Sequence, residues 1–358
     1  MAVAAVLLFY LCRQLSLPSG LSLVTGIASG LSPGMFELTL YGMGGDVLYA
    51  VLLLATVLVI FVRRENLSYR TAILVGSIFG LATWIRPVGV YIAPVICLGL
   101  VVFAITASLS KRKSIGLGLL AFVTFWVVLL PWYVRNEVQT GHFFISSIPA
   151  YNFTYYNVPD FFAYQRGTTR TQELPELFAS LGNPSLTELP SYTMTDTLTA
   201  YDRAFLKQHF FAYVPFHIIK SIPFFLSSAL SDDATLLRQA GFDVPFIRSS
   251  SNLTSLLLRH DFKAIAIHLA AHWPFTLESI MWAVLFLGAF LAPFLARDRQ
   301  ERLLLVLGIM LILASAAVTG PVALSRYRVP IEPYVWLGVA YTLWWGLRRH
   351  SYFSTSAS

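Results

Sequence analysis

Two arginines lie close together near the C-terminus, in a short charged stretch between two strongly apolar segments. The stretch is residues 325–333, and it contains Arg326, Tyr327, Arg328 and Glu332. A charged side chain at the end of a membrane helix is costly unless it is paired, reaches the interface or meets an anionic ligand. Because the guanidinium fork matches phosphate oxygens, the first ligand to consider is a lipid-linked phosphate.

Further charged residues flank other apolar segments and are expected at the same level of the membrane. Asp46 is the candidate catalytic carboxylate, and the predicted substrate-binding residues are Glu37, Arg86, Arg135, Arg326, Tyr327 and Arg328. Several arginines at one interface are what a site for an anionic lipid head group requires. Each arginine also has a plainer interpretation, as an anchor of its helix at the interface. Asp46 has one too, because an acid at a helix start caps free N–H groups.

The elements that must position these residues are membrane helices. The chain has 358 residues, of which 56% are hydrophobic and 12% charged, and its mean hydropathy is +0.67. These values exclude an ordinary soluble domain. The basic residues fall in short clusters between apolar segments, which favours a membrane surface over nucleic acid as their partner. Cys12 and Cys97 both lie in apolar runs, so neither a disulfide framework nor a cysteine metal site is predicted.

The apolar runs predict an all-α polytopic membrane protein with about nine transmembrane helices. Several runs are shorter than about 20 residues, which tilt can accommodate. The predicted spans are residues 1–12, 17–31, 46–62, 71–85, 88–109, 114–134, 277–295, 302–322 and 331–347.

Every second connection between these spans is basic, which predicts that those connections face the cytoplasm. The basic residues concerned are Arg13, Arg63, Arg64, Arg70, Lys111, Arg112, Lys113, Arg297, Arg299, Arg302, Arg348 and Arg349. The domains expected from this topology are N-terminal membrane helices over 1–134, an extracytoplasmic region over 135–275, C-terminal membrane helices over 276–350 and a cytoplasmic tail over 351–358.

Within the extracytoplasmic region, residues 210–230 are apolar enough to suggest a tenth span. We assign them to the membrane interface, because His217, Lys220 and two prolines interrupt the run and an extra span would invert every later basic connection. The chain has no glycine-rich phosphate loop, serine nucleophile elbow or paired-carboxylate motif. No resident cofactor is predicted, and a divalent cation is the one cofactor left open.

Five strings of the sequence together resemble the polytopic glycosyltransferases of family 39 and their relatives, which include protein mannosyltransferases and bacterial transferases of the lipopolysaccharide core. Order and spacing agree over nearly the whole chain. The strings are residues 81–89, 131–136, 141–142, 151–153 and 325–333.

The resemblance implies an enzyme that takes a sugar from a polyprenyl-phosphate carrier and transfers it, outside the cytoplasm, to a lipid, glycan or protein acceptor. In relatives, arginines at the outer membrane face hold the carrier phosphate, which corresponds to Arg86, Arg135, Arg326 and Arg328 here. Asp46 corresponds to an acidic position that often opens its helix. The sequence has no eukaryotic retention signal, which favours a bacterial plasma membrane.

One departure from the family concerns its main catalytic acid, which lies in a first extracytoplasmic loop after an initial helix. This chain begins like the later part of a helix that should follow that loop, so we expect an amino-terminally truncated product or gene model, with Asp46 as the best remaining acid; the alternative is a variant that places its base elsewhere. Transfer needs a base for the acceptor proton and cations for the departing phosphate, which predicts a single displacement with inversion.

Other function classes fit the same residues. A flippase or exporter of lipid-linked saccharides would also use arginines and many helices, although the spans show no internal repeat and the charges gather at one face instead of the midplane. An O-antigen ligase or polymerase would have a large outer loop and a pyrophosphate-linked donor. An inactive truncated remnant is the last alternative.

Overall fold

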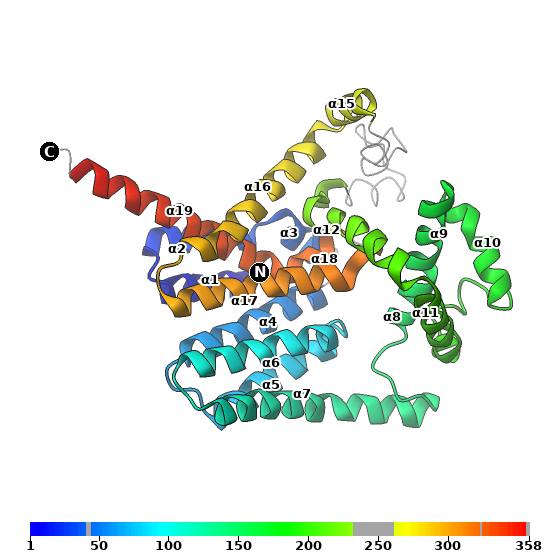
Figure 1. Cartoon of the computed structure of the whole chain (residues 1–358), viewed down its shortest axis with the longest axis horizontal. Helices are drawn as coiled ribbons and strands as arrows, with labels where there is room; N and C mark the ends of the chain where they lie inside the picture. The colour runs from blue at the N-terminus through cyan, green and yellow to red at the C-terminus, as the bar shows by residue number, and fades with distance from the viewer. Residues whose placement is uncertain (41–43, 232–260, 323, 356–358) are drawn as a thin grey trace.

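The chain folds as an assembly of helices. The structure is a computed structural model that describes residues 1–40, 44–231, 261–322 and 324–355, and every regular element in those ranges is helical (Figure 1). The all-α prediction is therefore confirmed for the described part of the chain. The helices of the N-terminal part are α1 (Ala2–Gln14), α2 (Ser19–Gly30), α3 (Pro33–Leu40), α4 (Gly44–Val62), α5 (Tyr69–Ile85), α6 (Gly89–Thr106) and α7 (Lys111–Thr140).

A group of shorter elements follows α7, and long helices return at the C-terminus. The middle elements are α8 (Ile148–Asn152), η1 (Phe153–Asn157), α9 (Val158–Arg166), α10 (Arg170–Ser180), η2 (Tyr192–Met194), α11 (Thr195–Lys220) and α12 (Ile222–Leu226). The C-terminal elements are α15 (Phe262–Ala271), α16 (Trp273–Leu295), α17 (Arg299–Thr319), η3 (Gly320–Val322), α18 (Ser325–Arg328), η4 (Val329–Ile331) and α19 (Glu332–Thr355).

Six segments of the described chain are long and apolar enough to cross a membrane, so nine spans are not confirmed. They are α4, α6, α7, the run from η2 to α12, α16, and α17 with η3. Three of the predicted spans correspond to the shorter helices α1, α2 and α5, which have 13, 12 and 17 residues. The run Tyr192–Leu226 meets the length and composition for a span, although we assigned 210–230 to the interface. The last helix, α19, continues to Thr355, past the expected end at residue 347.

Most of the long helices form one bundle, and the elements from α8 to α11 lie at one end of it. Figure 1 shows α4, α5, α6 and α7 side by side, while α8 to α11 lie beyond the ends of α4, α5 and α6, at the end to which the longer α7 extends. The α6–α7 and α16–α17 connections lie at the opposite end, so two of the predicted basic connections share one end of the bundle (Figure 1). We call the group from α8 to α11 the end module.

The end module has an aromatic core of its own. Val158, Phe161, Leu177, Phe205, Tyr213 and Phe216 are all buried and pack together. Rings in this cluster meet edge to face, as for Phe161 and Phe205 with centroids 5.3 Å apart, an arrangement that adds about 0.5–1.5 kcal/mol per pair to area burial. Gly141, with φ +73°, ends α7 in the left-handed region and lets the chain turn into the module. The module is therefore held by its own packing.

The approach of α5 to α7 depends on small residues. Gly76 and Gly80 of α5 face α7, where an added Cβ at Gly76 would overlap the Ala121 carbonyl oxygen and one at Gly80 would lie 2.8 Å from Val128. Small residues let membrane helices approach closely, so that dispersion contacts replace a hydrophobic driving force that lipid cannot supply. The pair of glycines sets the position of α5, whose C-terminal end carries Arg86.

We expect Gly76→Ala to destabilise the protein by about 1–3 kcal/mol, because the new methyl group overpacks the α5–α7 contact. Thermal unfolding in one detergent measures this. Gly116→Ala on α7 is the matched control, since a Cβ at Gly116 meets nothing within 4 Å, and there the better helix former should leave stability unchanged or raised. Equal melting temperatures for the two variants would contradict the packing role of Gly76.

Candidate functional site

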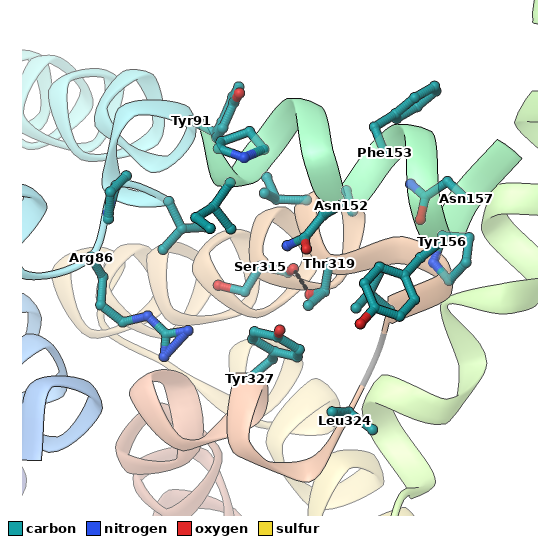
Figure 2. A pocket seen from close by; sticks show the side chains of 18 of the residues that line it. Arg86, Tyr91, Asn152, Phe153, Tyr156, Asn157, Ser315, Thr319, Leu324 and Tyr327 are labelled. Atoms are coloured by element: carbon teal, nitrogen blue, oxygen red, sulfur yellow. Dashed lines mark hydrogen bonds between the residues drawn. The ribbon is translucent and has the colours of Figure 1, made fainter. Parts of the chain in front are cut away.

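A cavity of about 990 Å³ lies where the end module meets the bundle. Its walls come from segments far apart in the sequence: the α5–α6 connection with Arg86, the C-terminal part of α17 with η3, the stretch of α18 with Arg326 and Tyr327, and α8 with η1. Figure 2 shows Arg86 and Tyr327 on one side of this space, and Tyr156 and Asn157 on the other. The cavity is large enough for a drug-sized ligand.

Two of the predicted arginines meet at one end of the cavity. The Arg326 guanidinium carbon lies 4.8 Å from the centroid of the Tyr327 ring, and that of Arg86 lies 5.6 Å from the same centroid. Arg326 Nη2 donates a hydrogen bond of 2.9 Å to the Tyr327 hydroxyl. The charge of Arg326 also acts on Arg86, so two cations flank one phenol. We call Arg86, Arg326 and Tyr327 the arginine end of the cavity.

The arginine end has polar groups whose bonding is incomplete. Arg326 Nε is buried and has no hydrogen-bond partner among the described residues, and the same holds for the Tyr49 hydroxyl, which also lines the cavity. An unmade hydrogen bond of a buried donor costs about 1–3 kcal/mol, and more for a charged group. A ligand that accepts from these donors would recover that free energy. The end is therefore suited to an anion with several acceptor oxygens.

Asp46 forms an ion pair with Arg86. Its side chain is 10% exposed and that of Arg86 is 20% exposed, and Asp46 is not among the residues that line the cavity. Its position differs from the one expected for a base that activates an acceptor, because Arg86 stands between it and the cavity. Asp46 is a positioning residue here: it fixes the direction of the Arg86 guanidinium. Its place in the first turn of α4 also suits the helix dipole.

Arg328 does not line the cavity, although the sequence grouped it with Arg326. Its side chain is fully buried, with the guanidinium carbon 3.9 Å from the centroid of the Trp282 ring. Its Nη1 donates to the Ser227 carbonyl oxygen at 2.9 Å, and its Nε donates to Glu332 Oε1 at 3.4 Å. Residues two apart on a helix point about 200° apart, so Arg326 and Arg328 face different surroundings. Arg328 connects α18 to α12, α16 and α19.

The remaining predicted residues divide between packing and surface. Glu37 of α3 is 5% exposed and accepts a hydrogen bond of 3.4 Å from the Ser325 hydroxyl, so it holds α3 to α18. Arg135 is exposed on α7, where its guanidinium carbon lies 4.7 Å from the Trp132 ring centroid. Neither lines the cavity. Of the predicted substrate-binding residues, Arg86, Arg326 and Tyr327 are brought together, whereas Glu37, Arg135 and Arg328 are placed elsewhere.

A chain of hydrogen bonds joins the end module to α17 beside the cavity. Asn157 Nδ2 donates to the Tyr213 hydroxyl at 3.0 Å, that hydroxyl lies 3.0 Å from His217 Nδ1, and His217 Nε2 lies 2.7 Å from the Ala317 carbonyl oxygen. Asn157, His217 and Ala317 line the cavity. The sequence pattern indicated no site role for these residues. The signal for this wall was the run of tyrosines and asparagines around 151–157, which has no catalytic spacing.

The chemistry available in the cavity is cationic. Arginines and one histidine line it, but no aspartate or glutamate does so within the described residues. The part of the chain that the structure describes also contains no cluster of three His, Cys, Asp or Glu side chains that could hold a metal ion. The geometry therefore provides binding and charge stabilisation for an anion.

Comparison with known proteins assigns the chain to no family, because no family model, no curated protein and no solved structure matches it.

We expect Glu332→Gln to lower the free energy of unfolding by about 3–5 kcal/mol, because it leaves the buried charge of Arg328 without its carboxylate. Chemical unfolding in detergent measures the loss. Glu176→Gln is the control, since Glu176 pairs with Arg166 on the surface and such pairs contribute little. A Glu332→Gln variant as stable as Glu176→Gln would show that Arg328 does not depend on Glu332.

Proposed function

We propose that the protein is a membrane glycosyltransferase that moves a sugar from a polyprenyl-phosphate carrier to an acceptor in the extracytoplasmic space. The observation that carries the proposal is the arginine end of the cavity, where Arg86 and Arg326 flank Tyr327 and Arg326 Nε is buried without a partner among the described residues. Two guanidiniums at one place, one of them with a donor left over, suit a phosphate, which accepts several charge-assisted hydrogen bonds at once.

The location of the arginine end supports a lipid-borne donor. It lies where helices long and apolar enough to cross a membrane meet the end module. A phosphate held there by its arginines would leave the isoprenoid chain among membrane helices and the sugar in the cavity. The acceptor, whether lipid, glycan or protein, would then approach from the side of the end module.

In the proposed reaction the acceptor hydroxyl attacks the anomeric carbon of the sugar. The new carbon–oxygen bond forms as the bond to the carrier phosphate breaks, and the phosphate keeps the electron pair. Arg86 and Arg326 stabilise the negative charge that develops on this leaving group, a role that gains strength where water is excluded. The acceptor proton goes to a base, and we assign no described residue to that role, because no carboxylate lines the described cavity.

A translocator of lipid-linked saccharides is the second candidate, and the same absence of a carboxylate from the described cavity wall favours it. Such a protein would hold the phosphate and the sugar without breaking the bond between them. Purified full chain in lipid nanodiscs with radiolabelled polyprenyl-phosphate sugar separates the two, because a transferase consumes the donor and a translocator leaves it intact.

We expect Arg326→Gln to reduce transfer from the radiolabelled donor by about tenfold or more, because one charge-assisted contact to the phosphate contributes about 1.5–3 kcal/mol. The matched control is Arg135→Gln, since Arg135 is exposed and does not line the cavity. It should transfer at the wild-type rate. Transfer that is unchanged in Arg326→Gln, or lost equally in Arg135→Gln, would refute the phosphate role of the arginine end.

A further inference from the structure

The wall opposite the arginine end is built from the end module and has a different chemistry. Tyr151, Asn152, Tyr156 and Asn157 from α8 and η1 line the cavity there, together with Arg170 at the start of α10. Figure 2 shows Asn152 directed towards α17, between the arginine end and the side where Tyr156 and Asn157 lie. We call these five residues the tyrosine wall. It is separate from the residues that we assign to the donor phosphate.

The side chains of the tyrosine wall alternate apolar rings with hydrogen-bonding groups. Two phenols offer ring surface and a hydroxyl each, and two amides offer both donors and acceptors. Ser315 and Thr319 of α17 face Asn152 across the space (Figure 2). Aromatic surface combined with many convergent donors and acceptors suits a ligand that is apolar on its ring faces and hydroxylated at its rim, which is the chemistry of a sugar ring.

One buried polar group of the tyrosine wall, the side-chain oxygen of Asn157, has an unused capacity to accept a hydrogen bond. Asn157 is 7% exposed, and its Nδ2 is used by the Tyr213 hydroxyl. Its Oδ1 is buried and has no hydrogen-bond partner among the described residues. Buried amide oxygens are nearly always bonded, so an O–H donor of a ligand is the partner that this position calls for.

Arg170 adds a positive charge to the same wall. Its guanidinium carbon lies 4.9 Å from the centroid of the Tyr156 ring, and its side chain is exposed. The charges of Arg170 and Lys220 both act to lower the pKa of the Asp160 carboxyl. Burial acts in the opposite direction and is the larger effect, so the pKa of Asp160 is raised above its ordinary value. A guanidinium stacked on a tyrosine at the cavity wall is placed to bind a carboxylate or phosphate group of the ligand.

We propose that the tyrosine wall is the acceptor site and that the acceptor is an anionic saccharide, whose ring contacts Tyr156 and Asn157 and whose charged substituent is bound by Arg170. The role of this saccharide as an acceptor rests on the proposed transferase function. The binding of an anionic sugar to the tyrosine wall does not depend on that function. A ligand in this place would present a hydroxyl group towards the arginine end, where the donor sugar is proposed to lie.

Binding of glucose 1-phosphate and of glucose to the full chain in nanodiscs tests the proposal, with saturation-transfer NMR titrations as the readout. The phosphate should strengthen binding by about tenfold or more over glucose, since one charge-assisted contact contributes about 1.5–3 kcal/mol. Arg170→Gln should abolish that difference. Arg203→Gln is the control, because Arg203 is exposed on the same module and does not line the cavity. Tyr156→Leu should weaken both sugars by the same factor.

Binding of undecaprenyl phosphate, measured on the same samples, shows that each variant is folded and separates the two proposals. It should be retained in Arg170→Gln and in Tyr156→Leu. A preference of about tenfold for glucose 1-phosphate over glucose that survives in Arg170→Gln overturns the acceptor site, as does a preference that only Arg326→Gln removes. Absence of undecaprenyl phosphate binding in the unmodified protein would instead remove the proposed donor and leave the saccharide site standing.

Discussion

A guanidinium away from water needs negative or polar partners, and this constraint organises the junction between the helical bundle and the end module. Arg328 is bonded to Glu332 and to the carbonyl oxygens of Phe224 and Ser227 at the end of α12. Arg86 is paired with Asp46. The guanidinium of Arg326 is bonded only in part, because its Nε is buried without a hydrogen-bond partner among the described residues. Full burial and an ion pair with Glu332 make Arg328 structural, whereas Arg326 lines the cavity with a donor left over and is the arginine that suits a ligand.

Hydrogen bonds and ion pairs around the cavity hold Arg326 in place. Arg328 and Glu332 fix α18 between α12 and α19, and Glu37 attaches α3 to the same short helix through Ser325. The Asn157–Tyr213–His217 chain joins the end module to α17 on the other side of the cavity. Rigid support of this kind lowers the cost of holding a ligand, because the site does not have to be ordered when the ligand binds. The junction thus combines a fixed frame with an open, cationic interior.

The sequence predicted the long helices well, since runs such as 46–62 and 302–322 are apolar throughout and need no partner to be recognised. The sequence could not establish whether the shorter apolar runs form spans, because the stability of a helix as short as α2 depends on packing against its neighbours. It predicted that Arg86, Arg326 and Tyr327 meet, from their places at the ends of spans. It could not distinguish Arg326 from Arg328, because only the packing of α12 and α16 buries one of them. Tyr151 and Asn152 of the tyrosine wall belong to the string 151–153, but their spacing indicated no role, and the wall is recognised only in three dimensions.

The most direct test of the central claim is an experimental structure of the full chain with undecaprenyl phosphate. We expect the phosphorus atom at the arginine end, with its oxygens about 2.7–2.9 Å from nitrogen atoms of Arg86 and Arg326, and the isoprenoid chain leading into the surrounding lipid. A phosphate bound at any other place, or Arg86 and Arg326 pointing away from a common cavity, would contradict it.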